Sequence, residues 1–491
     1  MHKVLFPLTL LFCLLFTSCG SDYSTFEDNA QEYSKSDSKI TSLEINNLIA
    51  EIKLFATDRK FKKFFTNASF DKTKLITFLE KKGYKVDDQS PSVPPKNYFV
   101  NIYIENSGSM NGYVNGNTQF KGAIRDLLVM LKYYYGEKNI NINFINSDIY
   151  PTQLHGDIVT FSNTLNTKTF KIGNTVESNL NNIFNQILNK TAKDTVSILL
   201  SDCIYSIQGS KTEDLLSDQK SLTKDAFLTK FKSKERLATS IIKLTSEFNG
   251  TYYDKDNRKT QLSGQLRPYY IIIIATDKAM TNFNENIKLV KGKVEGFENK
   301  YNLTLNNYSQ GVYFSVINTS KDSGRFKPDR DFSDNGAIKG IEDVSITDRN
   351  SSNLIFSVAV DMSSIPVEES YIRDKDNYSI KNANYKIKGI YPFTEKGIKP
   401  NSVNMLAKAN AKPTHYIVFE STTPNFTNLN FTLKKQIPSW VYETNSNDDS
   451  NLSQNSNKTF GIKYLIEGIN EAYETESKNN DYLELTVNIK K

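Results

Sequence analysis

The predicted fold is decided by residues 99–110, FVNIYIENSGSM, in which an apolar run ends at a polar turn. The apolar side chains predict a buried strand that stops at Glu105. Hydroxyls follow on alternate residues, at Ser107 and Ser109, so the end of the strand carries several oxygen donors. Such hard ligands suit Mg²⁺, Mn²⁺ or Ca²⁺. We therefore predict a divalent-cation site at the end of this strand.

Around this stretch, residues 97–304 alternate between apolar strand patterns and helical patterns. The predicted strands are 98–104, 140–145, 195–201 and 269–275. The predicted helices are 118–135, 176–188 and 234–248. This order predicts an α/β fold with a doubly wound, mostly parallel sheet that helices cover on both faces. Ligands of such sheets bind beyond the carboxyl ends of the strands, where we expect Glu105, Asp202 and Asp277 to lie.

The polar groups at these strand ends resemble the metal-ion-dependent adhesion site of von Willebrand factor A domains. That family has Asp-x-Ser-x-Ser after its first strand, where this chain has Glu105, Ser107 and Ser109. A later family strand ends in Ser/Thr-Asp-Gly, where this chain has Asp202 followed by Cys203. The resemblance covers residues 97–300 and implies a Rossmann-like A-domain fold.

The resemblance also implies roles for individual residues. The two serines would ligate the cation directly, and Glu105 and Asp202 would supply negative charge. The family's Gly-Gly-Thr loop corresponds to residues 173–175, so Thr175 would complete the ligand set, with Ser178 as the alternative. A carboxylate of a protein or peptide partner would then occupy the open position of the cation. The competing interpretation is that Glu105 and the serines cap the turn and helix without any metal.

The N-terminus predicts export and lipidation. Residues 1–18 combine Lys3 with a mostly apolar stretch, which is typical of a signal peptide. Residues 16–19, FTSC, resemble a bacterial lipoprotein signal, whose cleavage would leave Cys19 as the lipid-bearing first residue. Residues 19–96 would form a tether and a helical lead-in, with helices at 42–65 and 72–82. Gly20 after the cysteine favours the outer membrane, on its periplasmic or surface face.

Composition narrows the remaining choices. The 491 residues carry a net charge of +6 without a dense basic block, which gives nucleic-acid binding little support. Beyond the signal and Cys19 the chain has one cysteine, Cys203, and two histidines, His155 and His415. An intrachain disulfide is thus excluded in the exported part, and a metal site must depend on oxygen ligands.

From residue 305 onward, spaced strand patterns replace the alternation of strands and helices. Residues 305–491 therefore predict a separate β-rich domain, for which a sandwich is the candidate architecture. The predicted strands are 311–317, 354–360, 385–391, 416–420, 429–433 and 483–489, and one helix is predicted at 460–473. Residues 444–458 are rich in Asn, Ser and Asp and predict a mobile surface loop.

From the sequence we expect an envelope-anchored, non-enzymatic protein that binds or scaffolds a protein partner through a cation. The alternative function is a metal-dependent hydrolase of envelope or glycan substrates, which would need a general base and a substrate cleft. Neither His155 nor His415 stands in a recognisable catalytic motif. A scaffold without a cation is the third possibility.

Overall fold

The computed structural model describes residues 22–37, 39–41, 45, 48–49, 52, 58–66, 69–87, 98–152, 161–162, 164–175, 178–207, 211–334, 336–346 and 352–491. The chain divides into two compact units, Met1–Pro95 and Lys96–Lys491. The predicted signal peptide, Cys19 and His155 lie outside the described residues. Within the described ranges, no helix combines the length and apolar character needed to cross a membrane.

The first unit packs helices α1 (Asp22–Asp37) and α3 (Lys72–Lys81) around a small aromatic core. Phe26 and Phe61 are fully buried there, with ring centroids 5.5 Å apart. The side chain of Asp71 caps α3 by accepting the backbone N–H of Thr73 at 3.1 Å, so the predicted second helix is confirmed. Half of the predicted helix 42–65 falls outside the described residues. Residues 45, 48, 49 and 52 are helical, but 58–65 form turns, a short 3₁₀ helix (Lys62–Phe64) and the start of a strand, so the prediction is wrong for its C-terminal part.

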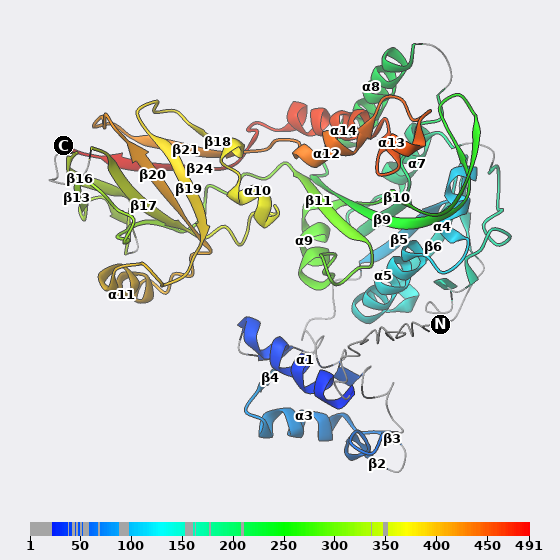
Figure 1. Cartoon of the computed structure of the whole chain (residues 1–491), viewed down its shortest axis with the longest axis horizontal. Helices are drawn as coiled ribbons and strands as arrows, with labels where there is room; N and C mark the ends of the chain where they lie inside the picture. The colour runs from blue at the N-terminus through cyan, green and yellow to red at the C-terminus, as the bar shows by residue number, and fades with distance from the viewer. Residues whose placement is uncertain are drawn as a thin grey trace, which may run out of the picture. The chain divides into compact units, whose positions relative to one another are not determined.

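The second unit is built on a large mixed sheet (Figure 1). In the described ranges its seven strands run in the order β11-β9-β10-β8-β5-β6-β7. Their bounds are β5 (Phe99–Glu105), β6 (Ile140–Ile145), β7 (Ile149–Pro151), β8 (Thr195–Ser201), β9 (Leu237–Tyr253), β10 (Lys259–Thr276) and β11 (Phe297–Thr304). Strand β5 pairs in parallel with β6 and with β8. The other pairs are antiparallel, namely β7 with β6, β10 with β8, and β9 with both β10 and β11. An α/β fold is confirmed, but only the centre of the sheet is parallel.

The predicted helix 234–248 is wrong, because these residues belong to the long strand β9. Leu237, Ile241 and Leu244 are spaced as on a helix, but the segment is rich in β-branched residues and is buried on both faces, which favours a strand. Strand β10 then folds back between β9 and β8. Because β10 is antiparallel to β8, Asp277 lies at the sheet edge opposite to Glu105 and Asp202, which corrects its expected position.

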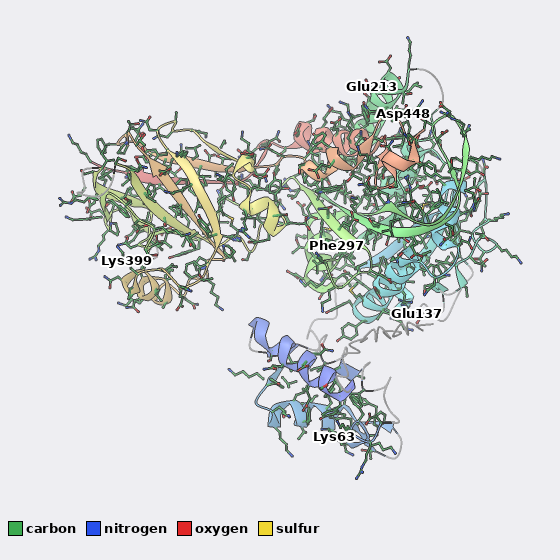
Figure 2. All side chains as sticks on the ribbon, in the orientation of Figure 1. Lys63, Glu137, Glu213, Phe297, Lys399 and Asp448 are labelled. Atoms are coloured by element: carbon green, nitrogen blue, oxygen red, sulfur yellow. The ribbon has the colours of Figure 1, made fainter. Side chains whose placement is uncertain are left out.

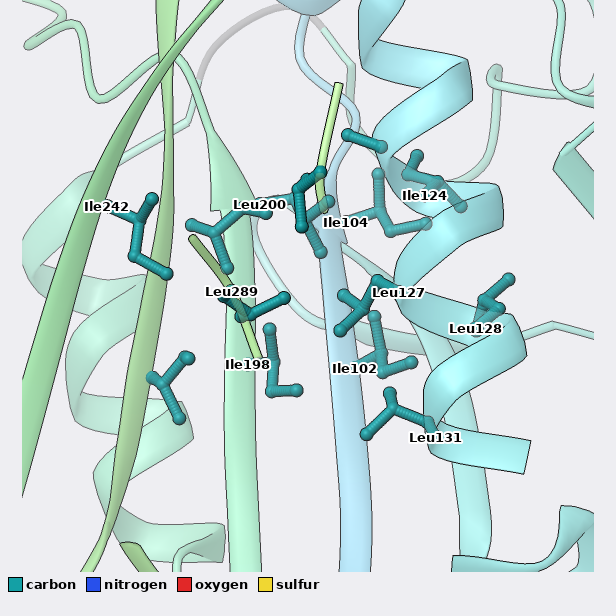
Figure 3. Packing of buried hydrophobic residues seen from close by; sticks show 14 of the residues in the cluster. Ile102, Ile104, Ile124, Leu127, Leu128, Leu131, Ile198, Leu200, Ile242 and Leu289 are labelled. Atoms are coloured by element: carbon teal, nitrogen blue, oxygen red, sulfur yellow. The ribbon is translucent and has the colours of Figure 1, made fainter. Parts of the chain in front are cut away.

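Helices cover both faces of the sheet (Figure 1). Helix α5 (Gln119–Tyr135) packs on one face, where Leu127 and Leu131 meet Ile102 of β5, as Figure 3 shows. Helices α7 (Leu180–Lys190), α8 (Thr212–Phe231) and α14 (Ile462–Glu476) cover the other face. Three of these helices, α5, α7 and α14, were predicted from their amphipathic spacing at nearly the observed positions.

The C-terminal half contains two further sheets packed as a sandwich. One sheet has the order β12-β17-β20-β19, with β12 (Phe314–Ile317), β17 (Leu354–Val360), β20 (His415–Ser421) and β19 (Lys386–Pro392). The other has the order β13-β16-β24-β21-β18, with β13 (Arg325–Pro328), β16 (Gly340–Ser345), β24 (Asp481–Ile489), β21 (Leu429–Lys434) and β18 (Tyr378–Ile380). Phe356, Phe419 and Phe431 fill the space between them.

Residues 437–476 leave the sandwich and return to the large sheet. Ile462, Ile466 and Ile469 of α14 are fully buried in the same core as β8 and β10. The hydroxyls of Tyr473 in α14 and Thr239 in β9 lie 2.9 Å apart. The segment that we assigned to a separate β-rich domain therefore supplies part of the helical layer over the αβ sheet.

We predict that Ile466→Ala lowers the free energy of unfolding of the second unit by about 2–5 kcal/mol, because it leaves a cavity beneath α14. Glu476→Ala, at the exposed end of the same helix, should change it by less than about 0.5 kcal/mol. Chemical denaturation monitored by tyrosine fluorescence measures both. Equal, small effects would show that α14 does not contribute to the core.

Candidate functional site

Strand register brings the first two groups of the site together. Ile104 of β5 lies opposite Leu200 of β8 in a parallel pair, so Glu105 and Ser201 end adjacent strands side by side. Both side chains are buried, with Glu105 1% exposed. The carboxyl ends of parallel strands share one edge of the sheet. The predicted position of Glu105 at that edge therefore follows from the pairing of β5 with β8.

Three serine hydroxyls converge on the Glu105 carboxylate. Ser107 donates to Oε1 at 2.8 Å, and Ser178 donates to the same oxygen. Ser201 donates to Oε2. These serines come from the turn after β5, from the residues before α7 and from the end of β8. A buried carboxylate needs such partners, because an unpaired buried charge is strongly unfavourable.

The turn after β5 holds the two serines of the predicted ligand set close together. The Ser107 and Ser109 hydroxyl oxygens are 3.0 Å apart. Ser107 occupies the N-cap position of a 3₁₀ turn (Gly108–Met110), but its hydroxyl makes no capping bond to the turn. A serine hydroxyl has one proton, and that of Ser107 points to Glu105, so in the 3.0 Å contact Ser109 is the donor and one lone pair of Ser107 remains available to an electrophile. Helix capping therefore does not account for Ser107.

Two asparagines position the loop that carries Thr175. The Asn106 side-chain amide donates to the carbonyls of Phe170 at 2.8 Å and Ile172 at 2.7 Å. Asn146, which follows β6, donates to Ile172 O at 2.8 Å and to Asn106 Oδ1 at 2.9 Å. Neither asparagine was among the predicted site residues, although each stands within two residues of the end of a predicted strand, and that placement was the available signal.

Thr175 itself lies against the serine turn. A Cβ added to Gly108 would stand 3.5 Å from the Thr175 carbonyl oxygen, so the two loops are in contact distance. Thr175 lines the same cavity as Ser107 and Ser109. The alternative residue, Ser178, is instead buried and bonded to Glu105. The structure thus brings all the predicted groups to one place but separates the roles of Thr175 and Ser178.

Asp202 lies behind the hydroxyls and is 1% exposed. Its Oδ1 accepts the Ile204 backbone N–H at 3.2 Å, whereas Oδ2 has no hydrogen-bond partner among the described residues. Burial and the neighbouring Glu105 charge raise the pKa of Asp202 to about 7, and the Ser109 hydroxyl opposes this rise. An unsatisfied, buried carboxylate oxygen beside a second carboxylate marks a place where positive charge is favourable.

Cys203 has a left-handed backbone conformation, which favours glycine. Its φ is 54°, in the left-handed region, and its N–H donates to Ser201 Oγ at 2.8 Å. A non-glycine residue there is unfavourable by about 1 kcal/mol. The thiol is buried, and burial raises its pKa well above the ordinary value. The Cys203 thiol is therefore unreactive, and its residue makes the turn that follows Asp202.

Arg267 is a charged residue of this region that the sequence analysis missed. It lies in β10, is 2% exposed, and its guanidinium stands 4.4 Å from the centroid of the Tyr252 ring. Its positive charge favours the ionised form of Asp202. Nothing in the sequence around Arg267 distinguishes it from an exposed arginine of a strand, because its burial depends on which segments pack over β10.

A cavity of about 810 Å³ opens in front of the hydroxyl groups. Its floor includes Ser107, Ser109 and Thr175, and the carboxylates of Glu105 and Asp202 stand behind this floor. The other lining residues come from the serine turn, the segment after β8, the β9–β10 turn and the C-terminal return: Gly108, Asn111, Ile204, Tyr205, Ser206, Ile207, Tyr253, Asp254, Lys255, Asn257, Lys259 and Phe460. The volume is in the range of ligand-binding clefts.

The donor set fits a hard divalent cation. Three hydroxyl-bearing residues line the cavity, two carboxylates are buried beside them, and Asp202 Oδ2 lacks a partner within the described ranges. Among those same residues, no group of three His, Cys, Asp or Glu side chains could hold a metal ion. A cation here would therefore depend on the serine and threonine hydroxyls and on its own water ligands. Such a site would suit Mg²⁺ or Mn²⁺ better than a soft metal.

Comparison of the chain with protein-family models and with curated protein sequences gave no match. The resemblance to A domains therefore rests on the sequence motifs alone.

We predict that Asp202→Asn stabilises the metal-free protein at pH 8 by about 2–4 kcal/mol, because it removes a buried charge. The raised pKa means that ionised Asp202 lowers folded-state stability. The loss of stability develops as the pH rises from about 4 to about 7, and it is complete above about pH 7. The stabilisation by asparagine should therefore nearly vanish at pH 4. Denaturant titrations in chelator at both pH values measure it, and a destabilised variant at pH 8 would contradict this assignment.

Proposed function

We propose that this chain is a cation-dependent binding protein whose site resembles the metal-ion-dependent adhesion site of A domains. The observation that carries the proposal is the convergence of Ser107, Ser109 and Thr175 on one cavity, backed by two buried carboxylates. Each of these groups was predicted from the resemblance before its position was known. A helix cap does not account for Ser107, because its hydroxyl makes no capping bond to the turn.

In this proposal Ser107, Ser109 and Thr175 would hold Mg²⁺ or Mn²⁺, with Ca²⁺ as a further possibility. Glu105 and Asp202 would compensate its charge from behind, and Glu105 would orient Ser107 by accepting its proton. A bound cation would supply an electrophile that attracts a carboxylate of a protein or peptide partner. The open side of the site toward the cavity is where such a group would enter.

Binding accounts for the cavity better than hydrolysis does. None of the described lining residues is a histidine, and Asp254 already accepts the backbone N–H groups of Asp256 and Arg258 at 2.9 Å. A metal-dependent hydrolase would need a general base within reach of the attacking water. The hydrolase therefore remains the alternative, and we propose a non-enzymatic protein.

The setting of this site would be the bacterial envelope. The N-terminal sequence supports export and lipid attachment at Cys19, most simply at the outer membrane. Lipid attachment would place the site on a membrane-tethered protein, where a weak partner contact gains from restricted diffusion. This part of the proposal rests on sequence and is tested by metabolic labelling with a palmitate analogue and loss of label in Cys19→Ser.

We predict that Ser109→Ala weakens Mn²⁺ binding at least tenfold, because it removes a ligand that faces the cavity. It should also abolish Mn²⁺-dependent binding of a fluorescein-labelled peptide with one aspartate among glycines. Ser206→Ala, an exposed serine that lines the same cavity, is the matched control and should bind normally. Calorimetry measures the cation and fluorescence anisotropy the peptide. Unchanged binding in Ser109→Ala, or binding that persists in chelator, would overturn the proposal.

We predict that Glu105→Asp, although it introduces the residue of the A-domain family, weakens both stability and Mn²⁺ affinity. The aspartate side chain is shorter, so its carboxylate would stand about 1.3 Å farther from the serine hydroxyls that donate to both oxygens of Glu105. Loss of these bonds should cost about 1–3 kcal/mol of unfolding free energy. Thermal denaturation with and without Mn²⁺ measures both effects. A more stable, tighter-binding aspartate variant would show that the site is not adapted to glutamate.

A further inference from the structure

The cavity in front of the serine turn has a second wall, which comes from the turn between β9 and β10. This wall contains Tyr253, Asp254, Lys255, Asn257 and Lys259. A cation with its water ligands needs only part of the cavity of about 810 Å³, because one water occupies about 30 Å³ in the liquid. The cavity therefore has room for more of the partner than a single carboxylate.

The charge on this wall that is not paired with an opposite charge is positive. Asp254, the carboxylate on it, pairs with Arg258 Nε at 3.2 Å and accepts two backbone N–H groups, so its charge is compensated within the turn. Lys259 is exposed, and among the residues that the structure describes no carboxylate pairs with it. Lys255 lies beside it on the wall and contacts Asp256 at 3.3 Å. A ligand in the cavity thus meets the ammonium group of Lys259 as well as the serine turn.

A buried network fixes the wall from behind. Tyr252, under the Arg267 guanidinium, donates its hydroxyl to Asp449 Oδ2 at 2.5 Å. The other oxygen of Asp449 accepts the Lys255 backbone N–H at 2.9 Å. Arg267 Nη1 also donates to the carbonyls of Asn455 at 3.1 Å and Ser456 at 3.2 Å. Side chains of Tyr252, Arg267 and Asp449 are each at most 2% exposed.

This network corrects the expectation of a mobile loop at residues 444–458. Asp449 is 2% exposed and bonded to the β9–β10 turn, and Asn447 donates to Glu213 at 2.7 Å. Figure 2 marks the neighbouring Asp448 and Glu213 on this part of the second unit. A wall held in this way loses little conformational entropy when a ligand binds, which favours recognition of a second group of the partner.

We propose that the partner is an acidic peptide segment with two carboxylates. One completes the coordination of the cation at the serine turn, and the other binds Lys259, with Lys255 beside it, on the opposite wall. This inference rests on the proposed function, because it uses the cation to anchor the first carboxylate. It adds the chemical class of the partner and a residue that determines specificity.

The test uses pairs of fluorescein-labelled peptides with the full-length protein in Mn²⁺. Each peptide has one aspartate among glycines, and a glutamate or a glutamine stands one, two or three residues after it. At least one glutamate peptide should bind about fivefold more tightly than its glutamine twin, as expected for a lysine–carboxylate pair near the surface. Lys259→Ala should remove this preference and Lys259→Glu should reverse it. Lys396→Glu, an exposed lysine of the sandwich, is the matched control and should preserve it.

The outcomes separate this inference from the proposed function. If no peptide binds in Mn²⁺, or binding persists in chelator, the proposed function fails. If binding depends on Mn²⁺ but no glutamate peptide exceeds its glutamine twin, the second carboxylate site is overturned. The same conclusion follows if the preference survives Lys259→Ala. A leucine peptide that binds more tightly than every glutamate peptide would show that the cavity selects an apolar side chain instead.

Discussion

The structure around the site depends on the buried carboxylate of Glu105. Its two oxygens accept hydroxyls from three segments, the turn after β5, the lead into α7 and the end of β8. Because a buried charge is tolerated only with partners, these segments are constrained to meet at one point. The same bonds direct the Ser107 proton to Glu105, so toward a cation Ser107 can act only as an oxygen donor. One carboxylate therefore fixes both the loop geometry and the chemistry of the site.

The parallel centre of the fold was predictable because its signals are local. Strands β5 and β8 are continuous apolar runs that end in polar residues, and such runs in a βαβ order imply parallel neighbours with a shared edge. Glu105, Ser107, Ser109 and Asp202 could be placed at this edge from that argument. The antiparallel side was not predictable in the same way. The spacing of β9 fits a helix as well as a strand, and only its pairing with β10 and β11 decides between them.

Contacts between distant segments were the other part that the sequence could not supply. The amphipathic pattern of α14 indicates that one face is buried, but it does not identify the surface that buries it. That surface is the large sheet, where Tyr473 of α14 contacts Thr239 of β9, more than two hundred residues earlier in the chain. Arg267 illustrates the same limit, since its carbonyl partners, Asn455 and Ser456, lie far along the chain. Burial of a charge becomes visible only when such segments are brought together.

Three features that lower stability occur around one cavity. Asp202 keeps a buried oxygen without a partner in the described ranges, Cys203 adopts a left-handed backbone, and Arg267 is buried with carbonyls and a tyrosine ring as its contacts. A neutral residue in place of Asp202, or glycine in place of Cys203, would remove the corresponding cost. Local exceptions of this kind are expected where a fold serves binding, because the ligand supplies the missing interactions. A cation beside Asp202 would satisfy its unpaired oxygen. The buried carboxylate that lowers the stability of the isolated chain is therefore the same group that would attract the cation in the proposed function.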